Sequence, residues 1–383
     1  MSFVQKLIAD YCEEPSLIYE PFAGTGTTLF AADSMGCDTI YSEVNPLLQF
    51  LISTKLHVMG LNRHDRKLMS KQLNELSGTI IPALGVHEPD KKLATAYEHV
   101  FGSSAYFPPQ ELQNILRLKT YISSVYRYDS LLGDLLTTAV IACLLPVSYL
   151  KKQGDVRFKT VKELRQMQQM QDLLPTKIEE IASDLTAYDF FTCHSHELVT
   201  PNAKHIGQVQ TAEISTIITS PPYLNGTNYF RNTKLELWFL GMLPDKKALR
   251  TFRNEALTSG INDVLLKDCN QQNDYCSPLL EKTIGELAAH AYDARIPQMA
   301  RCYFNEMSEL FCGLKGHLRD HADLLIDLGD SIFSNVHIKT DDILIEVLES
   351  IGYQFKDKVQ LRQRHSRGGG MLSQVLLVFK FRP

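Results

Sequence analysis

The segment that decides the fold is residues 16–28, which read SLIYEPFAGTGTT. Its first four residues suit a brief strand, a helix is predicted at 29–35, and a second strand at 38–41. Gly24 and Gly26 lie between the first strand and the helix. Glycine there lets the backbone approach a ligand closely, and the start of a helix offers free N–H groups. The order strand, glycine loop, helix, strand predicts a doubly wound α/β sheet.

An acidic residue, Glu43, lies at the tip of the second predicted strand. A carboxylate at this place can accept hydrogen bonds from both hydroxyls of a ribose. The loop is G-T-G rather than G-x-G-x-x-G, which favours a single nucleoside over a dinucleotide. Thr25, Thr27 and Thr28 supply hydroxyls where a P-loop would have a lysine. The alternative is an ordinary turn between strand and helix in which Glu43 is a solvated cap.

A second motif, Ser220-Pro221-Pro222-Tyr223, follows an apolar run at 214–218 that predicts a buried strand. The prolines end the strand and hold the backbone extended, because each fixes φ and neither donates to a sheet. Unpaired carbonyl oxygens, a hydroxyl and an aromatic ring then lie together. Such a cluster suits a planar ring that carries an amino group. Alone, the motif is equally compatible with a rigid turn.

The other segments predict one α/β domain with insertions. Strands at 353–361 and 374–381 predict a terminal antiparallel hairpin, and the segment before about 185 is mainly helical. We therefore divide the 383 residues into a cofactor-binding part of the catalytic domain, a helical insertion that is the candidate target-recognition region, and a second catalytic part that carries Ser-Pro-Pro-Tyr and a smaller insertion: 1–59, 60–185, and 186–383 with its insertion at about 244–297.

Two basic segments are candidates for contact with nucleic acid, because the net charge of −5 gives no general attraction to it. The first, at 149–165, mixes basic and aromatic side chains and includes Lys151, Lys152, Arg157 and Lys159. A solvated helix face with a basic turn is the equal alternative for it. The second is the loop of the terminal hairpin, which carries Arg362, Arg364 and Arg367 with three glycines. A binding loop is preferred there over a disordered connector.

Several classes of protein are disfavoured by the composition. The longest apolar run, 138–150, is too short to span a membrane and contains Pro146. The N-terminus lacks a signal peptide, and we expect reduced cysteines and a cytoplasmic protein. The cysteines form no CxxC pair, and His194 and His196 lack a third ligand, so no metal site is expected.

Together, Glu20–Thr28, Glu43 and Thr219–Tyr223 resemble the motifs of the amino-group DNA methyltransferases. These enzymes use S-adenosylmethionine to methylate N4 of cytosine or N6 of adenine. The resemblance covers residues 1–57 and about 188–383. The family's glycine motif opens with Asp-Pro-Phe, where this chain has Glu20. Where the family usually places an aspartate beside the adenine of the cofactor, this chain has His194 or Ser195.

The resemblance implies roles for the residues of both motifs. The target base is flipped out of double-stranded DNA, its amino group donates to Ser220 Oγ and the Pro221 carbonyl, and Tyr223 stacks on it. Pro222 completes this catalytic set. The family's short helix before the glycine motif lines the cofactor pocket, which adds Phe3. The implied cofactor-binding residues are Phe3, Glu20, Phe22, Ala23, Gly24, Thr25, Gly26, Thr27, Thr28, Glu43, Val44, His194 and Ser195.

The resemblance leaves the exact reaction open. Ser220 is more typical of the cytosine-N4 members than of the adenine-N6 members, so cytosine N4 is preferred and adenine N6 is the alternative. A restriction-modification or defence system, with cognate proteins as possible partners, is the expected setting. An RNA or protein N-methyltransferase and a DNA-binding subunit without turnover are the hypotheses from other classes.

Overall fold

The computed structural model describes residues 2–13, 16–187, 194–224, 229–264, 275–365 and 370–382. The chain divides into two compact units. A sheet unit comprises Met1–Asn45, Cys193–Asn228 and Arg253–Pro383, and a helical unit comprises Pro46–Thr192 and Tyr229–Phe252. Both units are therefore built from segments that are distant in the sequence. The helical unit starts directly after the second strand, at Pro46.

The sheet unit alternates strands and helices. Its helices are α1 (Phe3–Tyr11), α2 (Thr27–Ser34), α13 (Pro278–His290), α14 (Arg295–Leu314) and α15 (Thr340–Ser350). Its strands are β1 (Leu17–Glu20), β2 (Asp38–Tyr41), β5 (His196–Leu198), β6 (Ile214–Thr219), β7 (Leu318–Gly329), β8 (Ser331–Phe333), β9 (Val336–Ile338), β10 (Tyr353–His365) and β11 (Met371–Phe381). Short 3-10 helices cover Ala203–Gln208, Ile261–Asp263 and Lys315–His317.

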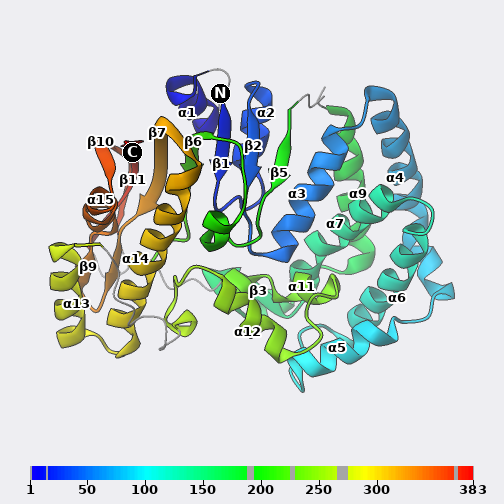
Figure 1. Ribbon diagram of the computed structural model, residues 1–383. Helices are drawn as coiled ribbons and strands as arrows, with labels where there is room; N and C mark the ends of the chain where they lie inside the picture. Colours follow the sequence, from blue (N-terminus) through cyan, green and yellow to red (C-terminus); the bar gives the residue numbers. More distant parts are fainter. Residues whose placement is uncertain are drawn as a thin grey trace. The chain divides into compact units, whose positions relative to one another are not determined.

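A seven-stranded sheet has the order β10-β11-β7-β6-β1-β2-β5 (Figure 1). The pairs of β1 with β2 and β6, of β2 with β5 and of β6 with β7 are parallel. Strand β11 is antiparallel to both of its neighbours, β7 and β10. The predicted α/β fold with a terminal antiparallel hairpin is confirmed. Chain order reverses between β1 and β6, which is where doubly wound sheets bind their ligands.

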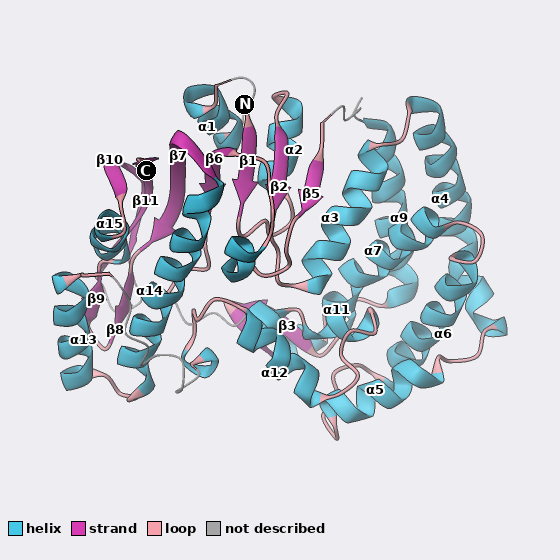
Figure 2. Cartoon of the chain, viewed as in Figure 1, coloured by secondary structure: helices cyan, strands magenta, loops and turns pink. Residues whose placement is uncertain are grey.

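Helices cover both faces of this sheet (Figure 2). Ile18, Ile218 and Leu325 pack on one face against α1 and α2. On the other face, alternate residues such as Ile217 and Leu324 pack against α14 and α15. Because successive strand residues point to opposite faces, a strand enclosed on both sides is buried throughout, as all six residues of β6 are, including the polar Ser215, Thr216 and Thr219.

The helical unit is held together by packing between long helices. Its elements are α3 (Pro46–Met59), α4 (Arg63–Ala83), α5 (Lys91–Phe101), α6 (Pro109–Val125), α7 (Ser130–Val147), α8 (Val161–Leu164), α9 (Met170–Ala187), α10 (Tyr229–Asn232), α11 (Lys234–Phe239) and most of α12 (Lys246–Glu255), with strands β3 (Leu150–Gln153) and β4 (Asp155–Phe158) and the 3-10 helix Leu84–Val86. Trp238 is fully buried in this unit and donates from Nε1 to the Leu93 carbonyl at 3.0 Å.

Helix α7 corrects one expectation. Over 18 residues its mean hydropathy is 1.9, so it has the length and composition of a membrane span, whereas the run at 138–150 was expected to be too short. The helix is longer than that run because it begins at Ser130, behind an Asp129 N-cap. Within the fold, 61% of this window is buried, which is typical of a core helix.

The basic segment at 149–165 is a β-hairpin followed by the short helix α8, which differs from the alternative of a solvated helix face with a basic turn. Strands β3 and β4 pair through Leu150–Phe158 and Lys152–Val156, and Gly154 has φ 77° at the turn. Glycine adopts this conformation without the strain that a side chain would add. The cysteine expectation is also corrected, because Cys302 takes part in a disulfide, while Cys143 remains a thiol.

Candidate functional site

The loop between β1 and α2 places bare backbone at the carboxyl end of the sheet. Gly24 and Gly26 have φ 57° and 88°, values that side chains rarely adopt. Gly26 is the N-cap of α2, and no side chain caps the first turn of this helix. A Cβ added to Gly24 would meet only the Phe22 carbonyl, at 4.0 Å. The loop therefore leaves open space beside a helix N-terminus, an arrangement suited to a polar ligand.

Glu43 closes this loop from the neighbouring strand. Its Oε2 accepts from the Gly24 N–H at 2.8 Å, and its Oε1 accepts from the Asn45 N–H at 2.8 Å. The side chain is 7% exposed, so the interpretation of Glu43 as a solvated cap is wrong. Each carboxylate oxygen can accept more than one hydrogen bond, which leaves capacity for a ligand's hydroxyl groups.

Glu20 joins the two sequence motifs, which is a role that the sequence did not reveal. Its Oε1 accepts from the Phe22 N–H at 3.1 Å and from Thr219 Oγ1 at 2.6 Å, and its Oε2 accepts from Thr28 Oγ1 at 2.7 Å. Thr219 directly precedes the Ser-Pro-Pro-Tyr motif. One buried carboxylate thus fixes the glycine loop against the end of β6, although these segments are 199 residues apart.

The carboxyl groups of Glu20 and Glu43 both have raised pKa values. Burial raises the pKa of Glu20 to about 7, although hydrogen bonds from Thr219 and Thr28 oppose the rise. Burial also raises the pKa of Glu43 to about 7, against hydrogen bonds from the Asn45 and Gly24 N–H groups. The negative charge of Glu43 contributes to the rise at Glu20. Perturbed carboxyl groups beside a glycine loop are typical of functional sites.

The Ser-Pro-Pro-Tyr motif extends from the end of β6. Ser220 is exposed, and in the described part of the chain its Oγ has no hydrogen-bond partner. Tyr223 is half-buried, and its hydroxyl donates to Asp327 Oδ1 at 3.2 Å. Gln374 Nε2 donates to the same hydroxyl at 3.0 Å. An accessible hydroxyl and an anchored aromatic ring therefore follow the strand that Glu20 ties to the glycine loop.

The other residues predicted from the sequence divide into two groups. Those of the loops after β1 and β2 lie with Gly24 and Glu43 at the carboxyl end of the sheet: Phe22, Ala23, Thr25, Thr27, Thr28 and Val44. Phe3, His194 and Ser195 do not belong to this group. We correct the predicted cofactor set by removing these three residues.

The reason for this correction is the direction of the strands and of α2. Ser195 precedes β5, its N–H donates to Asp38 Oδ1 at 2.7 Å, and Asp38 is the first residue of β2. His194 Nδ1 also lies 3.5 Å from Asp38 Oδ1. Both residues are therefore at the amino end of the parallel strands. Phe3 is the first residue of α1, and Gln5 of this helix donates a hydrogen bond to Ser34, the last residue of α2. The glycine loop adjoins the first residue of α2, so Phe3 lies near the opposite end of that helix.

Most of the basic residues of the helical unit that were predicted to contact nucleic acid bind other groups of the protein. Arg157 and Lys151 both donate to Glu163, at 2.7–3.0 Å, and hold the pKa of that carboxyl well below its usual range. Lys159 Nζ donates to the carbonyls of Pro146 and Ser148 at 2.7 and 2.6 Å. Of the four predicted cations, only Lys152 has a side-chain charge without a hydrogen-bond or ion-pair partner within the described residues.

The terminal hairpin carries its arginines on the edge strand β10. Arg362 and Arg364 are exposed, with Gln374 and Leu372 as their Cα partners on β11. The charge of Arg362 also lowers the pKa of Asp327, although burial raises it overall. Arg362 thus lies within electrostatic range of the Tyr223 anchor. Arg367 lies outside the described residues.

Sequence reasoning missed Asp327 and Gln374. The signal for Asp327 was available, because it is an acidic residue inside an apolar strand, L-L-I-D-L-G. A buried carboxylate needs hydrogen-bond donors, and the sequence does not say which residues supply them. Gln374 carries no comparable signal.

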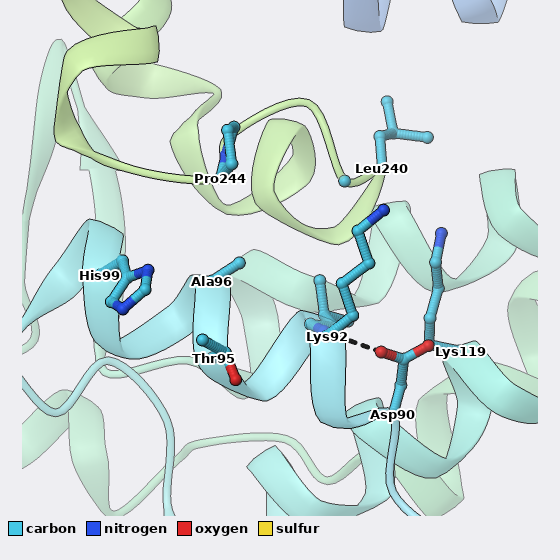
Figure 3. Close-up of a pocket in the computed structure, with 10 residues that line it drawn as sticks. Asp90, Lys92, Thr95, Ala96, His99, Lys119, Leu240 and Pro244 are labelled. Carbon is cyan, nitrogen blue, oxygen red and sulfur yellow. Dashed lines mark hydrogen bonds between the residues drawn. The ribbon is translucent and has the colours of Figure 1, made fainter.

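A cavity of about 480 Å³ lies within the helical unit (Figure 3). Its lining combines apolar groups of α5 and of the segment after α11 with Lys92, Lys119 and His99. Lys119 Nζ lies 5.1 Å from the centre of the Phe239 ring, and burial lowers the pKa of this ammonium. None of the predicted site residues is among the residues that line this cavity.

The fold and the loop geometry define a Rossmann-like methyltransferase sheet, and similar proteins agree with this class. The chain is 23% identical, over an alignment of 413 positions, to type II methyltransferase M.BsoBI of Geobacillus stearothermophilus, with 94% of this chain and 78% of that protein covered. It is 22% identical over 388 residues to type II methyltransferase M.AvaI of Nostoc sp. and of Anabaena variabilis, with 92% and 76% covered. No family model matches the chain. These relatives support a methyltransferase of the type II kind.

Proposed function

We propose that this protein is a site-specific DNA methyltransferase that modifies an exocyclic amino group, with cytosine N4 as the target. The observation that carries the proposal is the hydrogen bond from Thr219 to Glu20, at 2.6 Å. It places a Ser-Pro-Pro-Tyr motif beside a glycine loop and an acidic strand end in one sheet. The similarity to type II methyltransferases supports the same reaction class and a restriction-modification setting.

The glycine loop and Glu43 fit S-adenosylmethionine. The carboxylate of Glu43 would accept from the ribose hydroxyls, and Gly24 leaves open space where a side chain would otherwise be. Gly26 and the uncapped first turn of α2 offer N–H groups to the polar part of the cofactor. When bound, this cofactor supplies the methyl group and leaves as S-adenosylhomocysteine. Phe22, Ala23, Thr25, Thr27, Thr28 and Val44 complete the proposed lining.

The Ser-Pro-Pro-Tyr motif would orient the amino group of the base. Ser220 Oγ and the Pro221 carbonyl accept its two N–H bonds, which draws the nitrogen lone pair out of conjugation with the ring. Tyr223 stacks on the base after the base leaves the duplex. The bond from the methyl carbon to nitrogen would form as the bond from that carbon to sulfur breaks, and the nitrogen would release one proton to solvent. Positioning supplies most of the acceleration, and no covalent intermediate with the protein is needed.

The proposed partner is double-stranded DNA, held through phosphate contacts. Arg362 and Arg364 on β10 and Lys152 on β3 are predicted cations that are exposed and form no ion pair within the described residues. The segment 60–185 remains our candidate for target recognition. A cytoplasmic location, with cognate restriction or defence proteins, would follow from a restriction-modification role.

The decisive experiment is plasmid methylation with S-adenosylmethionine labelled in the methyl group, followed by digestion to nucleosides. Label in N4-methylcytosine is the expected result, and label in N6-methyladenine would shift the target to adenine. The same assay is repeated with RNA or a protein mixture in place of plasmid. Label in one of these substrates, together with no label in DNA, would contradict the proposal. Cofactor binding without transfer to any substrate would favour a subunit without turnover.

A further inference from the structure

The hydroxyl of Tyr223 is anchored by two residues that belong to neither sequence motif. Asp327 comes from the carboxyl end of β7 and Gln374 from β11, strands that lie side by side in the sheet (Figure 1). The Tyr223 ring lies against Gly329, 3.5 Å from the position that a Cβ of this glycine would take. Gly329 is also the Cα partner of Gln374. The end of the sheet therefore forms a seat for the ring and its hydroxyl.

Each of the three polar groups contacts the other two. The Tyr223 hydroxyl donates to Asp327 Oδ1 at 3.2 Å and accepts from Gln374 Nε2 at 3.0 Å. The same Nε2 group lies 2.8 and 3.0 Å from the Asp327 oxygens, so its two hydrogens are shared among these oxygens and the hydroxyl. A tyrosine hydroxyl can donate and accept at once, and both capacities are used here. A phenylalanine at this position would leave Asp327 and Gln374 facing each other only.

This network restricts the ring to one orientation. The tyrosine side chain turns about two torsions. Its hydroxyl lies on the axis of the second torsion, so the hydrogen bonds fix the direction of the side chain, and the contact of the ring with Gly329 restricts the turn of the ring about that axis. Groups that hold an aromatic ring in its working orientation before the substrate arrives remove part of the entropic cost of binding. Asp327 is suited to such a role, because both of its carboxylate oxygens bind the network; burial raises its pKa, and Gln374, Tyr223 and Arg362 oppose that rise.

We propose that Asp327 and Gln374 are positioning residues that hold Tyr223 ready to stack on the flipped base. The inference rests on the proposed methyltransferase function and deepens it. It assigns catalytic importance to the hydroxyl of Tyr223, which the stacking role alone does not require. It also predicts that Asp327 acts through Tyr223 and not by touching the base.

The test is a double-mutant cycle with Tyr223→Phe, Asp327→Asn and the double variant, assayed for single-turnover methyl transfer to plasmid DNA. Each single variant should lose roughly tenfold in rate, as expected for a lost hydrogen bond to a charged group. In the Tyr223→Phe background, Asp327→Asn should add less than about twofold. Gln374→Leu should behave like Asp327→Asn, and the cofactor dissociation constant should stay within about twofold in all of them.

Asp323→Asn is the matched control. Asp323 lies on the same strand and pairs with Lys380 of β11 at 2.9 Å, but it is distant from Tyr223 in the register. This variant should keep the wild-type transfer rate even if the sheet is less stable. Rates of Tyr223→Phe and Asp327→Asn equal to wild type would overturn the inference, as would fully additive losses in the double variant. If wild-type protein transfers no methyl group to DNA, the proposed function fails instead.

Discussion

The carboxyl end of the sheet and the β3–β4 hairpin of the helical unit differ in how far their sequences predict their chemistry. At the sheet, two glycines and one acid specify a backbone shape, and the loop and Glu43 lie as expected. At the hairpin, the sequence shows four cations, but Glu163 and two backbone carbonyls occupy three of them. Backbone constraints can be recognised locally, whereas the availability of a charge depends on its neighbours in space.

The largest expected effect is at Ser220. Replacing Ser220 with alanine removes one of two acceptors for the amino group, and we expect a roughly hundredfold loss in the methyl-transfer rate. Cofactor binding, measured by calorimetry, should not change, because Ser220 is not part of the glycine loop. Ser215→Ala is the control, since Ser215 lies on the same strand and donates to the Leu17 carbonyl at 3.0 Å. Equal rates for Ser220→Ala and Ser215→Ala would break the contrast between the two regions.

The second prediction concerns the pH dependence of cofactor binding. Because the pKa of Glu43 is raised to about 7, its carboxylate is lost as the pH falls through that value. Binding should weaken by roughly thirtyfold between about pH 8.5 and about pH 5.5, if the ionised form accepts the ribose hydroxyls. Glu43→Gln should bind more weakly at high pH and remove most of this dependence. A wild-type dissociation constant that is flat over this range would contradict the role of Glu43.

The raised pKa values of Glu20 and Glu43 make the stability of the folded protein fall with increasing pH, whereas cofactor binding strengthens. The folded-state pKa values of Glu20 and Glu43 lie above the ordinary value of 4.5, so folding favours their protonated forms. Their contribution to stability is present below about pH 4.5 and is lost as the pH rises through about 7. Without cofactor, the free energy of unfolding contributed by this pair should therefore fall over the interval in which cofactor binding strengthens. Because the carboxyls interact, they titrate as a pair.

A smaller effect is expected at Gly24. In Gly24→Ala the new Cβ has space, but the left-handed conformation at φ 57° costs about 1 kcal/mol for an alanine. The loop should shift, and the affinity for the cofactor should fall by roughly tenfold. Gly285→Ala in α13 is the matched control, because its backbone is helical and no atom lies within 4 Å of the added Cβ. Calorimetry should find wild-type affinity for Gly285→Ala and a higher melting temperature.

The smallest effects are expected at the hairpin. Lys152→Ala should reduce the slope of log affinity for DNA against log salt by about 1, as for one lost phosphate contact. Lys159→Met should leave this slope unchanged and lower the melting temperature, because Lys159 satisfies two carbonyls at the C-terminal end of α7, those of Pro146 and Ser148. The reverse pattern, with Lys159 affecting the salt slope and Lys152 affecting stability, would show that these assignments are exchanged.

Much of the fold could be predicted from the sequence, because its signals are local. Residues 16–28 give strand, loop and helix in order, and β6 and β7 each contain buried apolar residues that indicate a strand. The cofactor-binding residues outside the glycine loop were harder to predict from the sequence. Phe3, His194 and Ser195 were assigned by analogy of sequence order, and the direction of the strands places them at the other end of the sheet.

The sequence by itself determined the glycine loop, the acid at the end of β2, the proline-stiffened end of β6 and the terminal hairpin. Each depends on residues whose backbone preferences act over a few positions. Only the tertiary structure decided that Glu20 would bind Thr219, that Asp327 and Gln374 would hold Tyr223, and that Glu163 would occupy Arg157. These contacts join segments brought together by strand register and packing, so no local pattern specifies them.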